Sequence, residues 1–154
     1  MIAMLKIRKA TTDDNQRARE IVALSFKDFD LKVEFDGLDF AIGSIGTVQS
    51  TNTIELVATW DAEICGILAV QTIDTRNAKL FGFHVVHAYR GKGIGRSMLM
   101  MAVQETKQLG LKRLYLDTWD NMHAAIALYT SLGWQRDSDP APESGANRSY
   151  FIDL

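Results

Sequence analysis

The sequence predicts a mixed α/β (α+β) fold, with helices packed on the faces of a mostly antiparallel sheet. Segments rich in β-branched residues occur between segments whose apolar residues have helical spacing. Three strand-like segments follow one another from Ile54 to Ala88 and are separated by short turns, which is typical of antiparallel pairing. A chain of 154 residues that is 47% hydrophobic can bury one core, so we expect one domain over residues 1–154.

The N-terminal segments predict a strand followed by a helix. In MLKIRKA, Leu5 and Ile7 alternate with basic residues, as in a half-exposed strand. TTDDNQRAREIVALSF has apolar residues at helical spacing, acids in its first turn, and Thr11 or Thr12 as its N-cap. Residues 27–50 have a mixed pattern, for which we expect a short helix or a loop with aromatic anchors.

The central segments NTIELVATW, EICGILAVQTID and AKLFGFHVVHA predict three consecutive strands. Asp61 lies in the tight turn between the first two, and TRNA joins the second to the third. From Ile94 onward the apolar residues recur with the period of a helix, which ends at Gly110 as its C-cap. A change from strands to a helix is therefore expected near residue 90.

The C-terminal segments predict one more strand and helix before the sheet closes. LKRLYLDT is strand-like, and MHAAIALYTSLG is helix-like with Gly133 as its C-cap. WQR and SYFIDL predict the closing strands. Both prolines, Pro140 and Pro142, lie in DSDPAPESGANRS, which we expect to be a surface loop.

Composition excludes several classes of protein. The 17 basic and 19 acidic residues give a net charge of -2, which provides no general attraction to nucleic acid or anionic lipid. Cys65 is the only cysteine, so no internal disulfide can form, and a reducing compartment is expected. No apolar run approaches the roughly 20 residues of a membrane span, and the N-terminus lacks the features of a signal peptide. We therefore expect a soluble, cytoplasmic protein.

The stretch YRGKGIGRSM concentrates three glycines and three cations at the junction between a strand and a helix. A helix N-terminus offers unpaired N–H groups and a partial positive charge, which favour phosphate. The P-loop motif is excluded because Gly93 follows Gly91-Lys92 where Ser or Thr is required. The dinucleotide fingerprint is excluded because Arg96 and Met98 occupy its last glycine position.

The pattern Arg-x-x-Gly-x-Gly, formed by Arg90, Gly93 and Gly95, resembles the acetyl-coenzyme A pyrophosphate loop of the GNAT N-acetyltransferase superfamily. The resemblance continues in register through LYLDT, MHAAIALYTSLGW and the last strand, and covers most of the chain from Glu63. It implies the GNAT acyl-CoA N-acyltransferase fold, in which about four helices flank the sheet. It also implies that acetyl-CoA is the cosubstrate, that the acceptor is an amine and that no metal ion is needed. The resemblance is compatible with a homodimer. A glycine-rich turn with solvated cations is the alternative for the motif alone.

By this resemblance, the loop amides hold the pyrophosphate and the preceding strand binds the pantetheine arm like an added strand. The residues expected to bind the cosubstrate are Val85, Val86, Arg90, Gly91, Lys92, Gly93, Ile94, Gly95 and Arg96. Tyr129 occupies the position of the general acid of the family, which protonates the leaving thiolate. A tyrosine that only packs in the core is the alternative.

The acceptor amine must lose a proton before it attacks, but KLFGFHVV lacks the glutamate that many relatives carry there. His84, Asp117 or a chain of water molecules could replace it. His84 and His87 would lie on opposite faces of a strand, which argues against a metal site. Many relatives have asparagine where Met122 stands here, with Asn121 one residue earlier. Thr118 is expected to cap the next helix or to line the acceptor cleft.

By the same resemblance, the acceptor is expected to contact the final strands and the segment after the first helix, which we follow from Phe26 to Phe40. The acids of this segment outnumber its lysines, so an acidic rim could favour a cationic amine, although a solvated helix face explains the same charges. Aromatic residues that could wall the pocket, or only pack in the core, are Phe26, Phe29, Phe35, Phe40 and Trp119. The alternatives to an enzyme are a noncatalytic acyl-CoA-binding module and a protein that binds another phosphorylated ligand.

Overall fold

The structure is a computed structural model, which describes residues 4–28, 30–37, 39–138 and 146–154. The strands are β1 (Leu5–Lys9), β2 (Ile54–Trp60), β3 (Glu63–Thr72), β4 (Asn77–Val85), β5 (Arg113–Thr118), β6 (Gln135–Arg136) and β7 (Arg148–Asp153). The helices are α1 (Asn15–Asp28), α2 (Phe40–Gly43), α3 (Ile94–Gln108) and α4 (His123–Ser131), with 3-10 turns at Thr12–Asp14 and His87–Tyr89. This confirms the predicted mixed fold.

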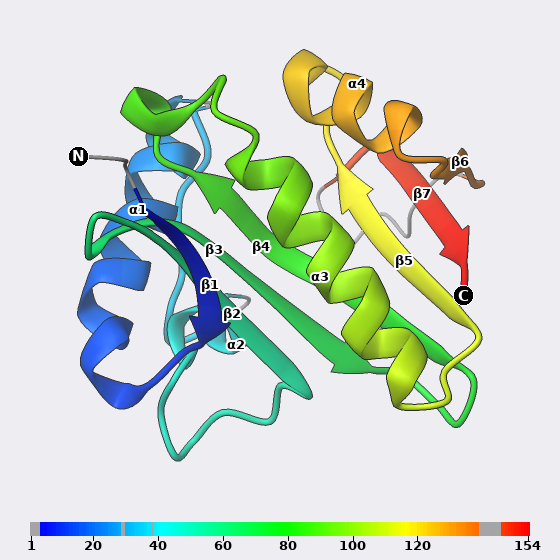
Figure 1. Ribbon diagram of the computed structural model, residues 1–154, viewed down its shortest axis with the longest axis horizontal. Helices are drawn as coiled ribbons and strands as arrows, with labels where there is room; N and C mark the ends of the chain where they lie inside the picture. The colour runs from blue at the N-terminus through cyan, green and yellow to red at the C-terminus, as the bar shows by residue number, and fades with distance from the viewer. Residues whose placement is uncertain (1–3, 29, 38, 139–145) are drawn as a thin grey trace.

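The strands form one seven-stranded sheet in the order β1-β2-β3-β4-β5-β7-β6. All neighbouring strands are antiparallel except β4 and β5. Helix α3 crosses the face of the sheet that is turned to the viewer, and α1 lies behind the sheet (Figure 1). Two apolar cores result, because residues of α3 and α4 pack on one face and residues of α1 on the other.

The prediction of the N-terminal elements is confirmed with one refinement. Thr11 precedes the helix as expected, and its N–H donates to the Asp14 carboxylate at 2.7 Å. The first turn, Thr12–Asp14, is a 3-10 helix rather than an α-helix. Arg8 of β1 donates two hydrogen bonds to Asp14, at 2.8 and 2.9 Å, so the helix start is tied to the first strand.

The segment with a mixed pattern contains the short helix α2, which the side chains of α1 hold in place. Asn15 Nδ2 donates to the carbonyls of Gly43 and Ile45, and Arg19 Nε donates to the same Gly43 carbonyl at 2.8 Å. Glu55 of β2 accepts hydrogen bonds from the following loop, including one from Gly46 N at 3.0 Å. The loop that leads from α2 to β2 is therefore held by partly buried hydrogen bonds.

The third predicted strand is shorter than expected. β4 ends at Val85, and His87–Tyr89 form a 3-10 turn. Earlier in the strand, Gly82 has a φ of 63°, and the register with β3 shifts between Ile67 and Ala69. A bulge of this kind bends the strand and increases its twist. The second half of β4 is therefore redirected away from the line of its first half.

The parallel pairing of β4 with β5 is confined to the first half of each strand. It runs from Asn77 with Arg113 to Leu80 with Leu116. Beyond these pairs the two strands diverge, and the first turn of α3 lies between their ends (Figure 1). Because the strands diverge, the backbone groups at their carboxyl ends do not pair with each other. The crevice at the carboxyl ends of parallel strands is a common location for a ligand site.

None of the helices in the described part of the chain has the length and hydropathy that a membrane-spanning helix needs.

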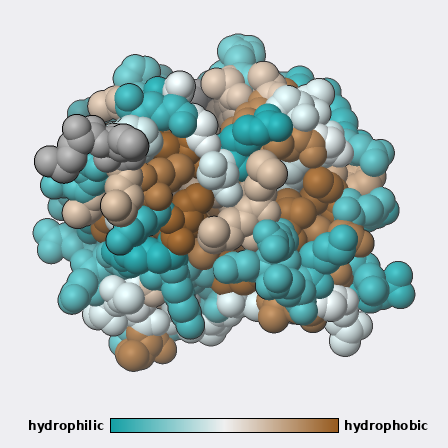
Figure 2. Space-filling model, viewed as in Figure 1, coloured by the Kyte–Doolittle hydropathy of each residue, from teal (hydrophilic) through white to brown (hydrophobic). Residues whose placement is uncertain are grey.

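The face that carries α3 has hydrophobic surface between hydrophilic side chains near its middle, while its rim is mostly hydrophilic (Figure 2).

Candidate functional site

A cavity of about 560 Å³ lies where β4 and β5 separate; we call it the first cavity. Its walls come from the end of β4, the loop before α3, the first turn of α3 and the N-terminal half of α4. Its lining comprises Ser25, Phe83, His84, Val85, Tyr89, Arg90, Gly91, Gly93, Ile94, Gly95, Arg96, Asn121, Met122, His123, Ala124, Ala125 and Leu128. It is large enough for a small-molecule ligand.

The glycine-rich loop presents backbone amides to the first cavity. Gly91 and Gly93 have φ values of 79° and 78°, in the left-handed region that other residues avoid. Gly93 is the N-cap of α3, and the first intrahelical bond is donated by Ser97 N to the Gly93 carbonyl. The amides of the three residues before Ser97 therefore have no partner within the helix, so this end of the cavity suits an anion.

Gly95 is required for a different reason, which is close packing. A Cβ at this position would lie 3.1 Å from Phe83 Cζ and 3.4 Å from Leu128 Cδ2. The absence of a side chain lets the first turn of α3 approach both β4 and α4.

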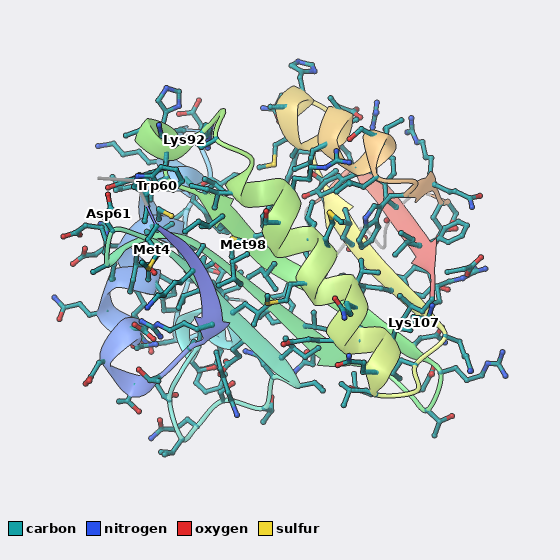
Figure 3. The ribbon with its side chains drawn as sticks, in the orientation of Figure 1. Met4, Trp60, Asp61, Lys92, Met98 and Lys107 are labelled. Atoms are coloured by element: carbon teal, nitrogen blue, oxygen red, sulfur yellow. The ribbon has the colours of Figure 1, made fainter. Side chains whose placement is uncertain are left out.

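Two of the three loop cations contact protein groups. Arg90 Nε donates to the Val85 carbonyl at 3.1 Å. Lys92 does not line the first cavity; its Nζ lies 5.2 Å from the centre of the Trp60 ring, and the two side chains are neighbours in Figure 3. A cation–π contact of this kind holds the ammonium away from the cavity. Arg96 lines the cavity.

The two valines at the end of β4 differ in their backbone contacts. Val86 N donates to the Cys65 carbonyl at 2.8 Å, and the Val86 carbonyl accepts a bond from Tyr89 N at 2.9 Å. Val86 therefore has both backbone groups engaged and lies outside the first cavity, contrary to the sequence-based expectation. Val85 lines the cavity, because adjacent residues of a strand direct their backbone groups to opposite sides.

A second cavity of about 330 Å³ adjoins the first. Its lining comprises Phe26, Asp39, Ala41, Ile42, Gln71, Lys79, Leu80, Phe81, Gly82, Phe83, His84, Leu116, Asp117, Thr118, Trp119, Met122, Tyr129 and Ala146. Phe26 and Ile42 belong to the core on the α1 side of the sheet, whereas Tyr129 belongs to the core on the α3 side. The second cavity thus extends through the separation between β4 and β5.

The two cavities share three lining residues, Phe83, His84 and Met122. A ligand in either cavity would contact this shared boundary. Two reactants bound one in each cavity would therefore meet at the end of β4, where the bulge at Gly82 has redirected the strand.

Tyr129 is buried, with 5% of its surface exposed, and lines the second cavity. Its ring packs against Phe83, Trp134 and Tyr150, with centroid distances of 6.3, 5.9 and 6.0 Å. No hydrogen bond joins its hydroxyl to another residue in the described ranges. Burial raises the pKa of Tyr129 above its ordinary value, so the hydroxyl stays protonated at neutral pH.

His84 is half-buried, and its ring meets the edge of Phe26 at a centroid distance of 6.0 Å. Burial, and to a smaller extent the charge of Arg90, lowers the pKa of His84 to about 4. The imidazole is consequently neutral at neutral pH and can accept a hydrogen bond. His87 is exposed in the 3-10 turn that follows β4.

Asp117 is held in an ion pair at the floor of the second cavity. Its Oδ2 accepts a bond from Lys79 Nζ, and its Oδ1 accepts one from Ser149 Oγ, both at 2.6 Å. Since both carboxylate oxygens are occupied, Asp117 is a poorer candidate for the base than His84. Thr118 does not cap α4: its hydroxyl donates to Met122 Sδ at 3.4 Å, and the residue lines the second cavity.

The expected acceptor residues are only partly brought together. Phe26 and Trp119 line the second cavity, whereas Phe40 is 48% exposed and Phe35 packs against Arg19 and Gly43. Phe29 lies outside the described residues. Of the acids between residues 26 and 40, Asp39 lines the cavity, and the remainder are on the exposed surface. The expected acidic rim is therefore reduced to one carboxylate at the cavity.

Several lining residues could not be identified from the sequence. Ser25 reaches the first cavity from α1, and His123 and Ala124 reach it from the start of α4. Phe81 and Phe83 line the second cavity from β4, and their sequence pattern predicts only that they lie in a strand. An aromatic residue in a strand gives no signal of its own, because the same pattern fits a packed core.

The fold and sequence are similar to those of acetyltransferases. The model of the "Acetyltransferase (GNAT) family" matches residues 26–134. An acetyltransferase of the GNAT family from Staphylococcus aureus has the same fold, with a TM-score of 0.83, 19% identity, and coverage of 98% of this chain and 99% of that one. An N-acetyltransferase from Thermoplasma acidophilum, solved in complex with coenzyme A, gives a TM-score of 0.74 at 17% identity over 98% of this chain and 99% of that one.

Sequence similarity to curated relatives is partial. The uncharacterised N-acetyltransferase YjgM of Escherichia coli is 33% identical over 70 residues, which are 46% of this chain and 42% of that protein. The ribosomal protein bS18-alanine N-acetyltransferase of Escherichia coli is 31% identical over 83 residues, or 54% of this chain and 51% of that protein. The chain thus spans about half the length of the curated relatives it matches.

Proposed function

The chain belongs to the acetyltransferase (GNAT) family, and we propose that it transfers an acetyl group from acetyl-CoA to a primary amine. The observation that carries the proposal is the pair of cavities that share Phe83, His84 and Met122. One cavity suits a ligand with a diphosphate, and the other suits a separate, smaller molecule. A cytoplasmic location belongs to the same proposal, because the lone Cys65 is compatible with a reducing compartment.

In the proposed complex, acetyl-CoA occupies the first cavity. The amides of residues 91–96 bind the pyrophosphate at the start of α3, and Arg90 and Arg96 balance its charge. The backbone of Val85 pairs with the pantetheine arm as an added strand would. The thioester then lies at the boundary between the cavities. No step in this scheme requires a metal ion.

The amine attacks the thioester carbonyl from the second cavity, the carbon–sulfur bond breaks, and the sulfur leaves as a thiolate. We assign Tyr129 as the general acid that protonates this thiolate. Its hydroxyl is protonated at neutral pH and so has a proton to donate, and its ring contacts Phe83 at the shared boundary. Its burial disfavours the phenolate, so Tyr129 must take up a proton from solvent within the same turnover.

His84 is the group we assign to accept the proton of the attacking amine. It lines both cavities, so it is within reach of an amine that approaches the thioester. Because its pKa is about 4, the ring is neutral when the amine attacks and passes the proton on to water without retaining it. Asp117 is not assigned this role, since Lys79 and Ser149 occupy its oxygens.

A noncatalytic acyl-CoA-binding module is the second candidate function. The low pKa of His84 favours it, because a weak base removes a proton from an amine less readily. Incubation of the protein with acetyl-CoA and a panel of amines, with free thiol as the readout, distinguishes the two. Amine-dependent release of thiol supports the enzyme, and saturable coenzyme A binding with no release for any amine supports the module.

A further inference from the structure

We infer that the second cavity selects a monoamine with an aromatic body, in preference to a polyamine or an amino acid; this inference rests on the proposed acetyl transfer. Its volume of about 330 Å³ is at the lower end of the range for small-molecule sites. A compact acceptor therefore fits, and the chemistry of the walls indicates its class.

The walls that would surround the body of the acceptor are aromatic. Phe26 contributes from α1, Phe81 and Phe83 from β4, and Trp119 from the segment after β5. Met122 adds a polarisable side chain at the boundary with the first cavity. Aromatic rings attract both the edges of another ring and an ammonium group. An acceptor with a polar body would lose its bound water on entering the second cavity, and the aromatic walls would not replace those hydrogen bonds.

The charges of the second cavity match a single ammonium group. Lys79 and Asp117 neutralise each other, with 2.6 Å between Nζ and Oδ2. Asp39 has no ion-pair partner among the described residues, and one of its oxygens accepts a bond from Glu34 N at 2.7 Å. One carboxylate is thus left to attract one cation.

The same charges disfavour the two other classes of acceptor. A polyamine carries further ammonium groups, but Asp28, Asp30 and Asp36 are exposed and lie outside the second cavity. The carboxylate of an amino acid would lie near Asp39 and would have to share Lys79 with Asp117. Either molecule would bring a charge into the cavity that lacks a partner of its own.

The test compares 2-phenylethylamine, L-phenylalanine and spermidine as acceptors with saturating acetyl-CoA. We expect kcat/KM for 2-phenylethylamine to exceed that for the other two by about tenfold or more. The variant Asp39→Asn keeps an acceptor for Glu34 N and should lower kcat/KM for 2-phenylethylamine by about tenfold. Asp36→Asn is the matched control, because Asp36 is exposed and lies outside the cavity. This variant should leave kcat/KM for 2-phenylethylamine unchanged.

Faster acetylation of spermidine or L-phenylalanine would overturn this inference and leave the proposed acetyl transfer intact. If coenzyme A binds but no amine is acetylated, the proposed function fails, and amine binding then decides the inference by itself. Calorimetric titration of the coenzyme A complex should give a lower Kd for 2-phenylethylamine than for spermidine. An equal or higher Kd for 2-phenylethylamine would overturn the inference.

Discussion

Leu80 of β4 and Leu116 of β5 form the last pair of the parallel ladder at the centre of the sheet. Beyond this pair the strands separate; the end of β4 lines both cavities, and Asp117 and Thr118 at the end of β5 line the second. The bulge at Gly82 follows Leu80 by two residues and provides the bend. The candidate site therefore depends on where the pairing of two strands stops.

Gly93→Ala should weaken coenzyme A binding by about tenfold, because a left-handed residue with a side chain strains the loop that presents the amides. Gly110→Ala is the matched control. Gly110 has a similar φ, 85°, also has open space around a Cβ, and lies at the far end of α3. Both variants should lose about 1 kcal/mol of unfolding free energy. Equal coenzyme A affinity in the two variants, measured by calorimetry, would contradict the assignment of the loop.

Tyr129→Phe should lower kcat by about 100-fold, the scale of a missing general acid, and leave the Kd for coenzyme A unchanged. The ring contacts with Phe83 and Trp134 are kept in this variant, so the fold should be preserved. Tyr115→Phe serves as the control because Tyr115 lines neither cavity. Steady-state kinetics with the best acceptor measure the effect, and a kcat equal to that of the parent protein would remove Tyr129 from the mechanism.

The free energy of unfolding should fall as the pH is lowered from about 6.5 toward 4, because of His84. The ordinary pKa is 6.5 and the folded value is about 4, so the unfolded chain binds the proton first as the pH falls. The expected loss that this residue contributes is about 2 kcal/mol by pH 4.5. Urea unfolding at several pH values measures it. The variant His84→Gln should show a shallower decline, and a decline as steep as in the parent protein would refute the role of this residue.

Asp14→Ala should reduce the free energy of unfolding by about 2 kcal/mol at pH 7, because it leaves Arg8 without its carboxylate and removes the acceptor for Thr11 N. Arg8 lowers the pKa of Asp14, so the stabilisation is lost as the pH falls below the ordinary carboxyl value of 3.8. The exposed neighbour Asp13 supplies the control, Asp13→Ala. Similar urea midpoints for both variants would contradict the structural role of the pair.

The elements of the fold could be predicted because their signals are local. The alternation around Leu5 and Ile7 and the turn at Asp61 act within a few residues. So do Gly110 and Gly133, although each follows the C-cap leucine of its helix and is not the C-cap itself. The glycine-rich loop was predictable for the same reason. The early end of β4 was missed, because the apolar run continues into a 3-10 turn whose hydrogen bonds have no sequence signal.

The site itself was only partly predictable, because it depends on contacts between distant segments. In sequence, Lys92 lies within the predicted phosphate-binding loop. In the structure, its ammonium group is attracted to the ring of Trp60, at the end of β2. The sequence gives no sign that Asp117 has partners. The register of the sheet places Lys79 and Ser149 beside it, and both donate hydrogen bonds to its carboxylate. Such pairings are decided by tertiary structure, which residue type and spacing do not specify.

Calorimetric titration of the purified protein with coenzyme A tests the central claim most directly, since every proposed step begins with this ligand in the first cavity. The account predicts saturable binding to one site, with affinity that falls when Gly93 is replaced and not when Gly110 is replaced. The absence of any binding heat up to millimolar coenzyme A, with folded protein confirmed in the same sample, would contradict it.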